Sequence, residues 1–138
     1  MARVAPLALR PSSAAPLDAM AIAWGGLVAS IGLMAGGGRD WPLRLAAAAI
    51  TFGIGGFLAG VRASSRRPVH ALAAGAAGYL IHAVFIALAR LIDTLGGPDA
   101  PALVPGTGRD WAFAAVWALA FAAAGGLVAN SWLRPAGR

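Results

Sequence analysis

The sequence predicts an all-α, polytopic membrane protein whose four transmembrane helices are arranged as two parallel-repeat hairpins. Three observations support this prediction: an apolar composition, four apolar runs of membrane-spanning length, and a repeated tetrapeptide. Of the 138 residues, 59% are hydrophobic and 12% are charged, whereas soluble domains carry about 25% charged residues. Cys is absent, so disulfides, thiolate chemistry and Cys-based metal sites are excluded.

The apolar residues gather in four runs, each close to the ~20 residues that an α-helix needs to cross the hydrocarbon core. The bilayer interior offers no water to the backbone, so each run is expected to be helical. A cleaved signal peptide in the first run is disfavoured, because three more apolar runs follow it. We expect one transmembrane domain at 19–133 between tails at 1–18 and 134–138, with helices at about 19–36, 43–62, 69–92 and 111–133.

The arginines predict which side of the membrane each loop faces, because cytoplasmic loops carry an excess of Arg and Lys. With a cytoplasmic N-terminus, the cytoplasmic arginines are Arg3, Arg10, Arg62, Arg66, Arg67, Arg134 and Arg138. The opposite side then has only Arg39, Arg44, Arg90 and Arg109. We therefore expect a multi-pass protein of the cell membrane with both termini cytoplasmic. A specific contact of these arginines with anionic lipid or with a protein is the alternative.

The arginines lie at the ends of the apolar runs and do not form one basic face. This distribution is typical of residues that meet lipid headgroups. We therefore expect the lipid bilayer as a partner and no binding of nucleic acid.

An internal repeat relates the two halves of the chain. Gly-Arg-Asp-Trp occurs at 38–41 and at 108–111, and this offset of 70 residues also pairs Gly55-Gly56 with Gly125-Gly126. A second offset, of 52 residues, lays 16–21 on 68–73 and brings Gly26 onto Gly78. The third helix thus resembles the first, and the fourth resembles the second. This pattern predicts two hairpins of the same orientation around a pseudo-twofold axis along the membrane normal.

Each copy of the tetrapeptide predicts an interfacial anchor where the second or fourth helix begins. Its Asp suits an N-cap, its Trp suits the headgroup level, and its Arg can reach lipid phosphates. A paired outer binding site built from the two Arg-Asp pairs is the alternative. The predicted anchor residues are Arg39, Asp40, Trp41, Arg109, Asp110 and Trp111.

Small residues spaced four apart predict the faces along which the helices pack, because such residues let two backbones approach closely in lipid. Most of these positions are expected to serve packing within the four-helix unit, and some a homodimer. The predicted packing residues are Gly26, Gly53, Gly55, Gly56, Ala59, Gly60, Gly78, Gly125 and Gly126.

Two adjoining stretches carry a family resemblance: Ile54-Gly-Gly-Phe-Leu-Ala-Gly-Val-Arg-Ala63 and Arg66-Arg-Pro-Val-His-Ala-Leu-Ala-Ala-Gly75. They resemble the small four-helix bacterial membrane proteins of the YrzE type, with a Gly-Gly-x-x-Ala-Gly-x-x-Ala turn before a helix rich in small residues. The chain departs from that pattern at Ala71, where many such proteins are expected to have Gly after the His. The resemblance implies a four-helix fold and no particular activity.

Three polar residues fall near the middle of predicted spans: Ser30, Thr51 and His82. A neutral His82 that hydrogen-bonds to either hydroxyl would join two helices, a contact worth ~0.6 kcal/mol. The alternative is a proton or ion relay at His82, although no Asp lies at that depth. His70 is expected to be a solvated residue at the inner surface. It lies ~18 Å of helix from His82, so we expect no metal site and no cofactor.

No catalytic constellation appears, since the chain lacks a Ser/His/Asp set at a plausible depth, a phosphate-binding loop and metal-ligand spacing. An enzyme is therefore not expected. We expect a small integral membrane protein of structural or accessory type that packs its helices with themselves, as a homodimer, or with a membrane-protein partner. The alternative is a small transporter or channel that uses His82 at mid-membrane, without the membrane-embedded Glu on which small multidrug transporters rely.

Overall fold

The computed structural model describes residues 17–35, 40–96 and 108–133, and their regular structure is entirely α-helical. The helices are α1 (Ala19–Ala35), α2 (Trp41–Arg62), α3 (Arg67–Gly96) and α4 (Gly108–Trp132). Three of them, α2 to α4, are long and apolar enough to cross a membrane, whereas α1 has 17 residues and is shorter. The prediction of an all-helical chain with membrane-spanning segments is confirmed to this extent.

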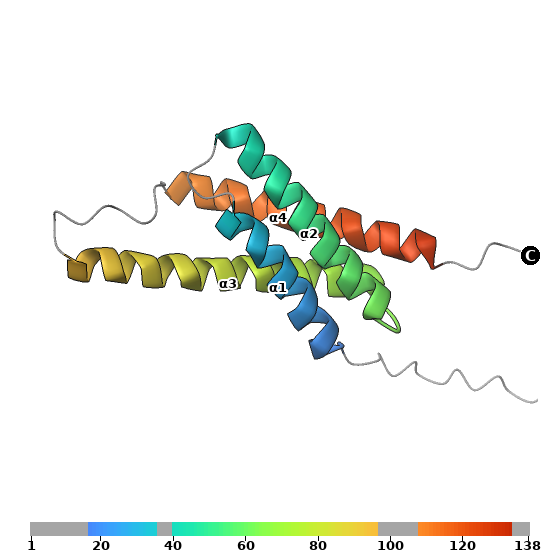
Figure 1. Ribbon diagram of the computed structural model, residues 1–138. Helices are drawn as coiled ribbons and strands as arrows, with labels where there is room; N and C mark the ends of the chain where they lie inside the picture. The colour runs from blue at the N-terminus through green and yellow to red at the C-terminus, as the bar shows by residue number, and fades with distance from the viewer. Residues whose placement is uncertain (1–16, 36–39, 97–107, 134–138) are drawn as a thin grey trace, which may run out of the picture.

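The four helices form a bundle in which consecutive helices run in opposite directions (Figure 1). α1 and α2 lie diagonally across α3 and α4. Both α1 and α4 pack against α2 and α3, and α2 also contacts α3, but within the described residues no Cα atom of α1 lies within 8 Å of a Cα atom of α4. The start of α1, the turn between α2 and α3, and the end of α4 all lie at one end of the bundle.

Three helices extend beyond their predicted bounds: α2 and α4 begin two and three residues earlier, and α3 is longer at both ends. α3 continues four residues past position 92, and the hydroxyl of Thr94 donates to the carbonyl of Arg90 at 2.8 Å in this added part. The helix ends at Gly96, ahead of Gly97 and Pro98 in the sequence, both poor helix formers. α2 begins at Trp41 because Pro42, which lacks an N–H, fits the first turn of a helix.

The interior of the bundle is built from small residues. Phe52 is the single large apolar side chain that is completely buried among the described residues. Around it, one core cluster joins α1, α2 and α4 through Ala29, Ala48, Ala118 and Ala122. The other apolar residues with no exposed surface are alanines as well: Ala59, Ala71, Ala74 and Ala129.

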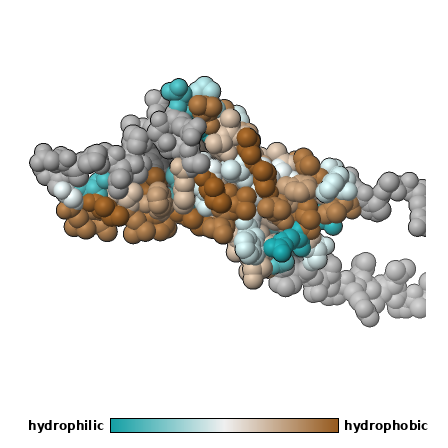
Figure 2. All heavy atoms as spheres, viewed as in Figure 1, coloured by the Kyte–Doolittle hydropathy of each residue, from teal (hydrophilic) through white to brown (hydrophobic). Residues whose placement is uncertain are grey.

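The large apolar side chains lie on the outside of the bundle. On α1 the exposed residues include Met20, Trp24, Leu27 and Ile31, whereas Ala21, Gly25, Ala29 and Gly32 on the opposite face are buried. Figure 2 shows apolar residues over most of the visible surface, with hydrophilic residues gathered toward its extremities. A soluble domain does not expose so continuous an apolar surface. This division by side-chain size is typical of helices that pack together in lipid.

Candidate functional site

Glycine contacts hold α1 against α2. A Cβ atom built on Gly25 would lie 2.6 Å from the carbonyl oxygen of Gly55, and one built on Gly55 would collide with the carbonyl oxygen of Gly25. Further along, a Cβ on Gly32 would overlap the side chain of Thr51. The two backbones therefore touch directly, and any side chain larger than a hydrogen atom at these positions would push the helices apart.

A second set of close contacts joins α1 to α3. A Cβ on Gly78 would lie 2.8 Å from the carbonyl oxygen of Gly26 and 2.7 Å from the Cβ of Ala29. A Cβ on Gly26 would lie 2.9 Å from the Cβ of Ala77. The structure thus brings together Gly26 and Gly78, which the offset of 52 residues aligns in the sequence.

The α2–α4 interface is also closely packed. A Cβ on Gly56 would collide with the carbonyl oxygen of Ala122, and a Cβ on Gly125 would collide with the carbonyl oxygen of Gly53. Nearer the end of the two helices, a Cβ on Gly60 would lie 2.9 Å from the Cβ of Ala129. Backbone therefore meets backbone at the centre of this interface.

Three more small residues complete the helix contacts. Gly126 faces α3, where a Cβ would overlap that of Ala71, and Ala59 is fully buried beside Gly25. Gly75 faces α4, where a Cβ would lie 2.6 Å from that of Ala122. The spacing of small residues also predicts packing at Gly32 and Gly75, which lie four residues from Gly36 and Ala71. Gly25 was missed, because spacing alone does not say which member of a Gly-rich face lies opposite a neighbouring helix.

Gly53 differs from the other predicted packing glycines, because it does not serve close packing within the four-helix unit. A Cβ built on Gly53 would meet nothing within 4 Å, so its missing side chain is not required by the packing of the bundle. Gly53 instead lines a shallow, open groove of about 450 Å³ between α2 and α4, which we call the α2–α4 groove. The groove is lined by Ala49, Ile50, Gly53, Ile54, Phe57, Phe121, Ala124, Gly125 and Val128.

An aromatic pair joins α2 to α4 at each end of their interface. Trp41, at the start of α2, packs against Phe113 of α4 with ring centroids 5.1 Å apart. The row continues along α4 from Phe113 to Trp117 at 5.9 Å and from Trp117 to Phe121 at 5.4 Å. At the other end of the interface, Phe57 of α2 lies 5.8 Å from Trp132 of α4. Aromatic pairs of this kind stabilise by about 0.5–1.5 kcal/mol each beyond their buried area.

The predicted anchors differ from expectation in how their helices begin. Asp40 occupies the N-cap position of α2, but its carboxylate makes no capping hydrogen bond, and only its backbone carbonyl accepts the N–H groups of Leu43 and Arg44. α4 begins at Gly108, so Asp110 lies inside the first turn and cannot be the N-cap. Arg39 lies outside the described residues, as do the side chains of Arg109, Asp110 and Trp111.

The mid-membrane polar residues lie on three different helices. Ser30 of α1 is buried, and its hydroxyl donates to the carbonyl of Leu27 at 2.8 Å. Thr51 of α2 donates to the carbonyl of Ala47, also at 2.8 Å. Both hydroxyl protons are therefore bonded within their own helices, so neither is donated to His82, which is partly buried on α3. A bond in which either hydroxyl accepts from His82 stays a prediction.

The prediction that His70 is a solvated end residue is wrong. His70 is 1% exposed, and its Nε2 accepts the backbone N–H of Asp18 at 2.8 Å. Its Nδ1 lies 3.2 Å from the carbonyl of Arg66 and donates to it. The carboxylate of Asp18 accepts the N–H groups of Met20 at 3.0 Å and Ala21 at 3.1 Å, so Asp18 is the N-cap of α1.

We call the contact between Asp18 and His70 the Asp18–His70 site, and it could have been predicted from the sequence. The offset of 52 residues aligns Asp18 with His70, and the same two residues prove to be in contact. The signal was missed because equivalent residues of a repeat touch only if they lie next to its axis, which the alignment by itself does not show.

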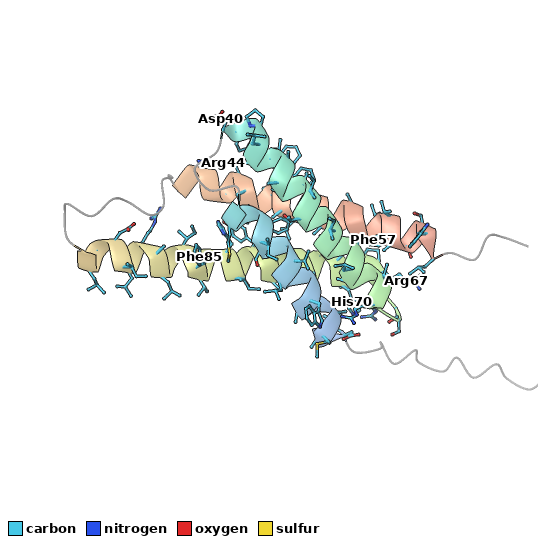
Figure 3. The ribbon with its side chains drawn as sticks, in the orientation of Figure 1. Asp40, Arg44, Phe57, Arg67, His70 and Phe85 are labelled. Carbon is cyan, nitrogen blue, oxygen red and sulfur yellow. The ribbon has the colours of Figure 1, made fainter. Side chains whose placement is uncertain are left out.

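Two arginines have a buried Nε atom with no hydrogen-bond partner among the described residues, namely Arg44 and Arg67. Figure 3 shows Arg44 near the start of α2, whereas Arg67 and His70 lie at the opposite end of that helix. In the part of the chain that the structure describes, no group of three or more His, Cys, Asp or Glu residues could hold a metal ion.

Comparisons of the chain with protein-family models, curated proteins and solved structures found no match. The resemblance to the YrzE type therefore stays a prediction. What the chain does must be inferred from its own packing.

Proposed function

We propose that the chain is a four-span integral protein of the cell membrane, with both termini cytoplasmic, that acts as a structural or accessory subunit by packing against a second copy of itself. The observation that supports this proposal is the separation of side chains by size between the interior and the surface of the bundle. Small residues fill the interior and large apolar residues face outward. This arrangement is favoured in lipid, where burying large apolar side chains between helices brings no hydrophobic stabilisation.

α1 is proposed as the fourth span, although it is the shortest helix. Its 17 residues extend ~26 Å, close to the ~30 Å of a hydrocarbon core. Its exposed face carries large apolar side chains along its whole length, including Met20, Trp24, Leu27, Ile31 and Met34. Because its other face packs against two membrane-spanning helices, α2 and α3, α1 shares their environment.

Arginines at two heights along the bundle support its transmembrane orientation. Arg44 lies in the first turn of α2 and Arg62 at its end, beside Arg67 at the start of α3. The 18 residues from Arg44 to Arg62 correspond to ~27 Å of helix, about the thickness of the hydrocarbon core. Guanidinium groups at both levels could therefore bond to lipid phosphates.

Two contacts support the parallel repeat. Residues 52 positions apart meet at both Asp18–His70 and Gly26–Gly78, as expected if a pseudo-twofold axis runs between α1 and α3. The symmetry is incomplete, because the backbone of α2 lies close to that of α3, whereas the Cα atoms of α1 and α4 are all more than 8 Å apart within the described residues.

The α2–α4 groove is the surface that we propose for self-association. Its lining is almost entirely apolar, and Gly53 leaves room in it that packing within the chain does not use. Ile50 and Ile54 line it from α2 and Val128 from α4. These branched side chains are exposed, so they could interlock with the same surface on a second copy in a twofold dimer.

A pair of leucine variants tests this proposal. Gly53→Leu should leave the bundle folded, because the new side chain enters open space, yet it should fill the groove and shift a homodimer to monomer. Gly56→Leu should instead disrupt the bundle itself, since its Cβ would collide with Ala122. The mass of the protein in mild detergent, measured by light scattering, and its helix content by circular dichroism separate the two results.

Two outcomes would count against self-association through the groove. One is a wild-type protein that is monomeric in mild detergent and in bilayer nanodiscs. The other is a dimer that Gly53→Leu leaves intact. A stable heteromer that co-purifies with the wild type and is lost in Gly53→Leu would assign the same groove to a different membrane protein.

A further inference from the structure

We propose that the Asp18–His70 site is a proton-sensitive latch that fixes the start of α1 to the start of α3 and releases it in acid. The side chain of His70 is almost completely buried, and both of its ring nitrogens are used. Figure 3 shows it between the first turn of α1 and the turn that leads into α3. Packing between helices does not by itself require a histidine at this place.

The hydrogen bonds define one protonation state of His70. The backbone N–H of Asp18 can only donate, so Nε2 must accept from it and carries no hydrogen atom. The carbonyl of Arg66 can only accept, so Nδ1 carries the hydrogen atom. His70 is thus a neutral imidazole whose tautomer is set by a partner on each side.

Protonation of His70 places a second hydrogen atom on Nε2, where it faces the N–H of Asp18. Two donors then point at each other, and the bond that ties α1 to α3 is lost. Atoms balance in this step, since one proton from water is added to Nε2 and no covalent bond between heavy atoms changes. The imidazolium must then find a new acceptor or move away from α1.

Among the described residues, the charged groups at this end of the bundle include one anionic acceptor. They are Asp18 before α1, Arg62 at the end of α2, and Arg66 and Arg67 where α3 begins. α4 has no titratable side chain from Ala112 to Leu133. Arginine carries donors only, so the carboxylate of Asp18 is the group that can pair with the imidazolium.

That carboxylate already caps α1 by accepting from Met20 and Ala21. If it turns to the imidazolium, α1 loses its N-cap, which costs about 0.5–2 kcal/mol. If it stays, His70 has no counter-ion. Either way, acid loosens the first turn of α1, the shortest of the four helices.

Hydrogen exchange of the backbone amides of residues 18–22, in nanodiscs, tests the latch. From about pH 8 to about pH 5, and after correction for intrinsic exchange rates, protection in the wild type should fall about tenfold, as expected for the loss of one hydrogen bond. His70→Gln retains an acceptor and does not titrate in this range, so its protection should not change with pH. Residues 125–132, at the same end of the bundle, should stay protected in both proteins.

A second variant separates the latch from a simple loss of packing. Asp18→Asn caps a helix as well as Asp but offers no charge to an imidazolium, so its cap stays in place in acid and its loss of protection should be no greater than that of the wild type. The latch proposal is overturned if, in the wild type, the amides of the first turn of α1 are equally protected at both pH values. It is also overturned if His70→Gln responds to acid as the wild type does, or if Asp18→Asn loses more protection than the wild type, since the Asp18 carboxylate would then hold α1 to α3 in acid.

Discussion

At the scale of single residues, Arg66 shows how the turn between α2 and α3 is shaped. Its φ of 50° lies in the left-handed region, which costs a non-glycine residue about 1–2 kcal/mol. In this conformation its carbonyl accepts three donors: the N–H groups of Val69 at 2.9 Å and His70 at 3.2 Å, and the His70 ring. The strained backbone is thus held in place by the start of α3 and by the latch.

Replacing Arg66 by Gly should relieve this strain. We expect Arg66→Gly to raise the free energy of unfolding by about 0.5 kcal/mol, because relief of the left-handed strain exceeds the entropy cost of glycine. Arg67→Gly, which removes the same charge from a residue in helical conformation, should lower it by up to ~1 kcal/mol. Thermal unfolding in detergent measures both. Equal destabilisation by the two variants would show that φ at Arg66 carries no strain.

The residue scale is also where prediction from sequence fails most. The sequence favours Asp40 and Asp110 as N-caps, whereas among the described side chains it is the carboxylate of Asp18 that caps a helix. The reason differs between the two residues. Asp40 is at the N-cap position of α2 but its carboxylate makes no capping hydrogen bond, whereas α4 begins at Gly108 and therefore has Asp110 inside its first turn. Burial of His70 depends on how closely α1 approaches α3.

At the scale of helices, the helix contacts depend on glycines. These glycines differ in how much space a side chain would find at their position. Gly53 and Gly56 belong to one Gly-rich stretch of α2, and the spacing of small residues marks both as packing positions. The structure distinguishes them, because Gly56 meets the backbone of Ala122 whereas the Cβ position of Gly53 is open. Spacing identifies the Gly-rich helix but not the direction in which each glycine points.

Alanine at these two positions should therefore have opposite effects on stability. Gly56→Ala is expected to cost about 1–3 kcal/mol, because one added methyl group forces α2 away from α4. Gly53→Ala should be neutral or stabilising by up to ~1 kcal/mol, since alanine favours helix over glycine. Unfolding of the purified protein by a denaturing detergent provides the comparison. Similar losses in the two variants would contradict the assigned contacts.

At the scale of the whole molecule, hydropathy alone predicts four helices near their observed places, because each must satisfy its backbone internally when it lies in lipid. The sequence does not predict that α1 and α2 cross α3 and α4 diagonally, or that the backbones of α1 and α4 stay more than 8 Å apart within the described residues. These features depend on where backbone meets backbone, as at Gly25–Gly55 and Gly26–Gly78. The bundle that results exposes its large side chains and hides its small ones.

Four spans with both termini on one side is the central claim, and the absence of Cys allows it to be tested with single cysteines. Ser12→Cys precedes α1, Ser64→Cys lies in the exposed turn between α2 and α3, and Ala102→Cys lies between α3 and α4 in the sequence. A membrane-impermeant maleimide should label Ala102→Cys in intact cells, and the other two only after permeabilisation. Labelling of Ser12→Cys and Ser64→Cys from opposite sides would contradict the account, because α1 and α2 could not then both cross the membrane.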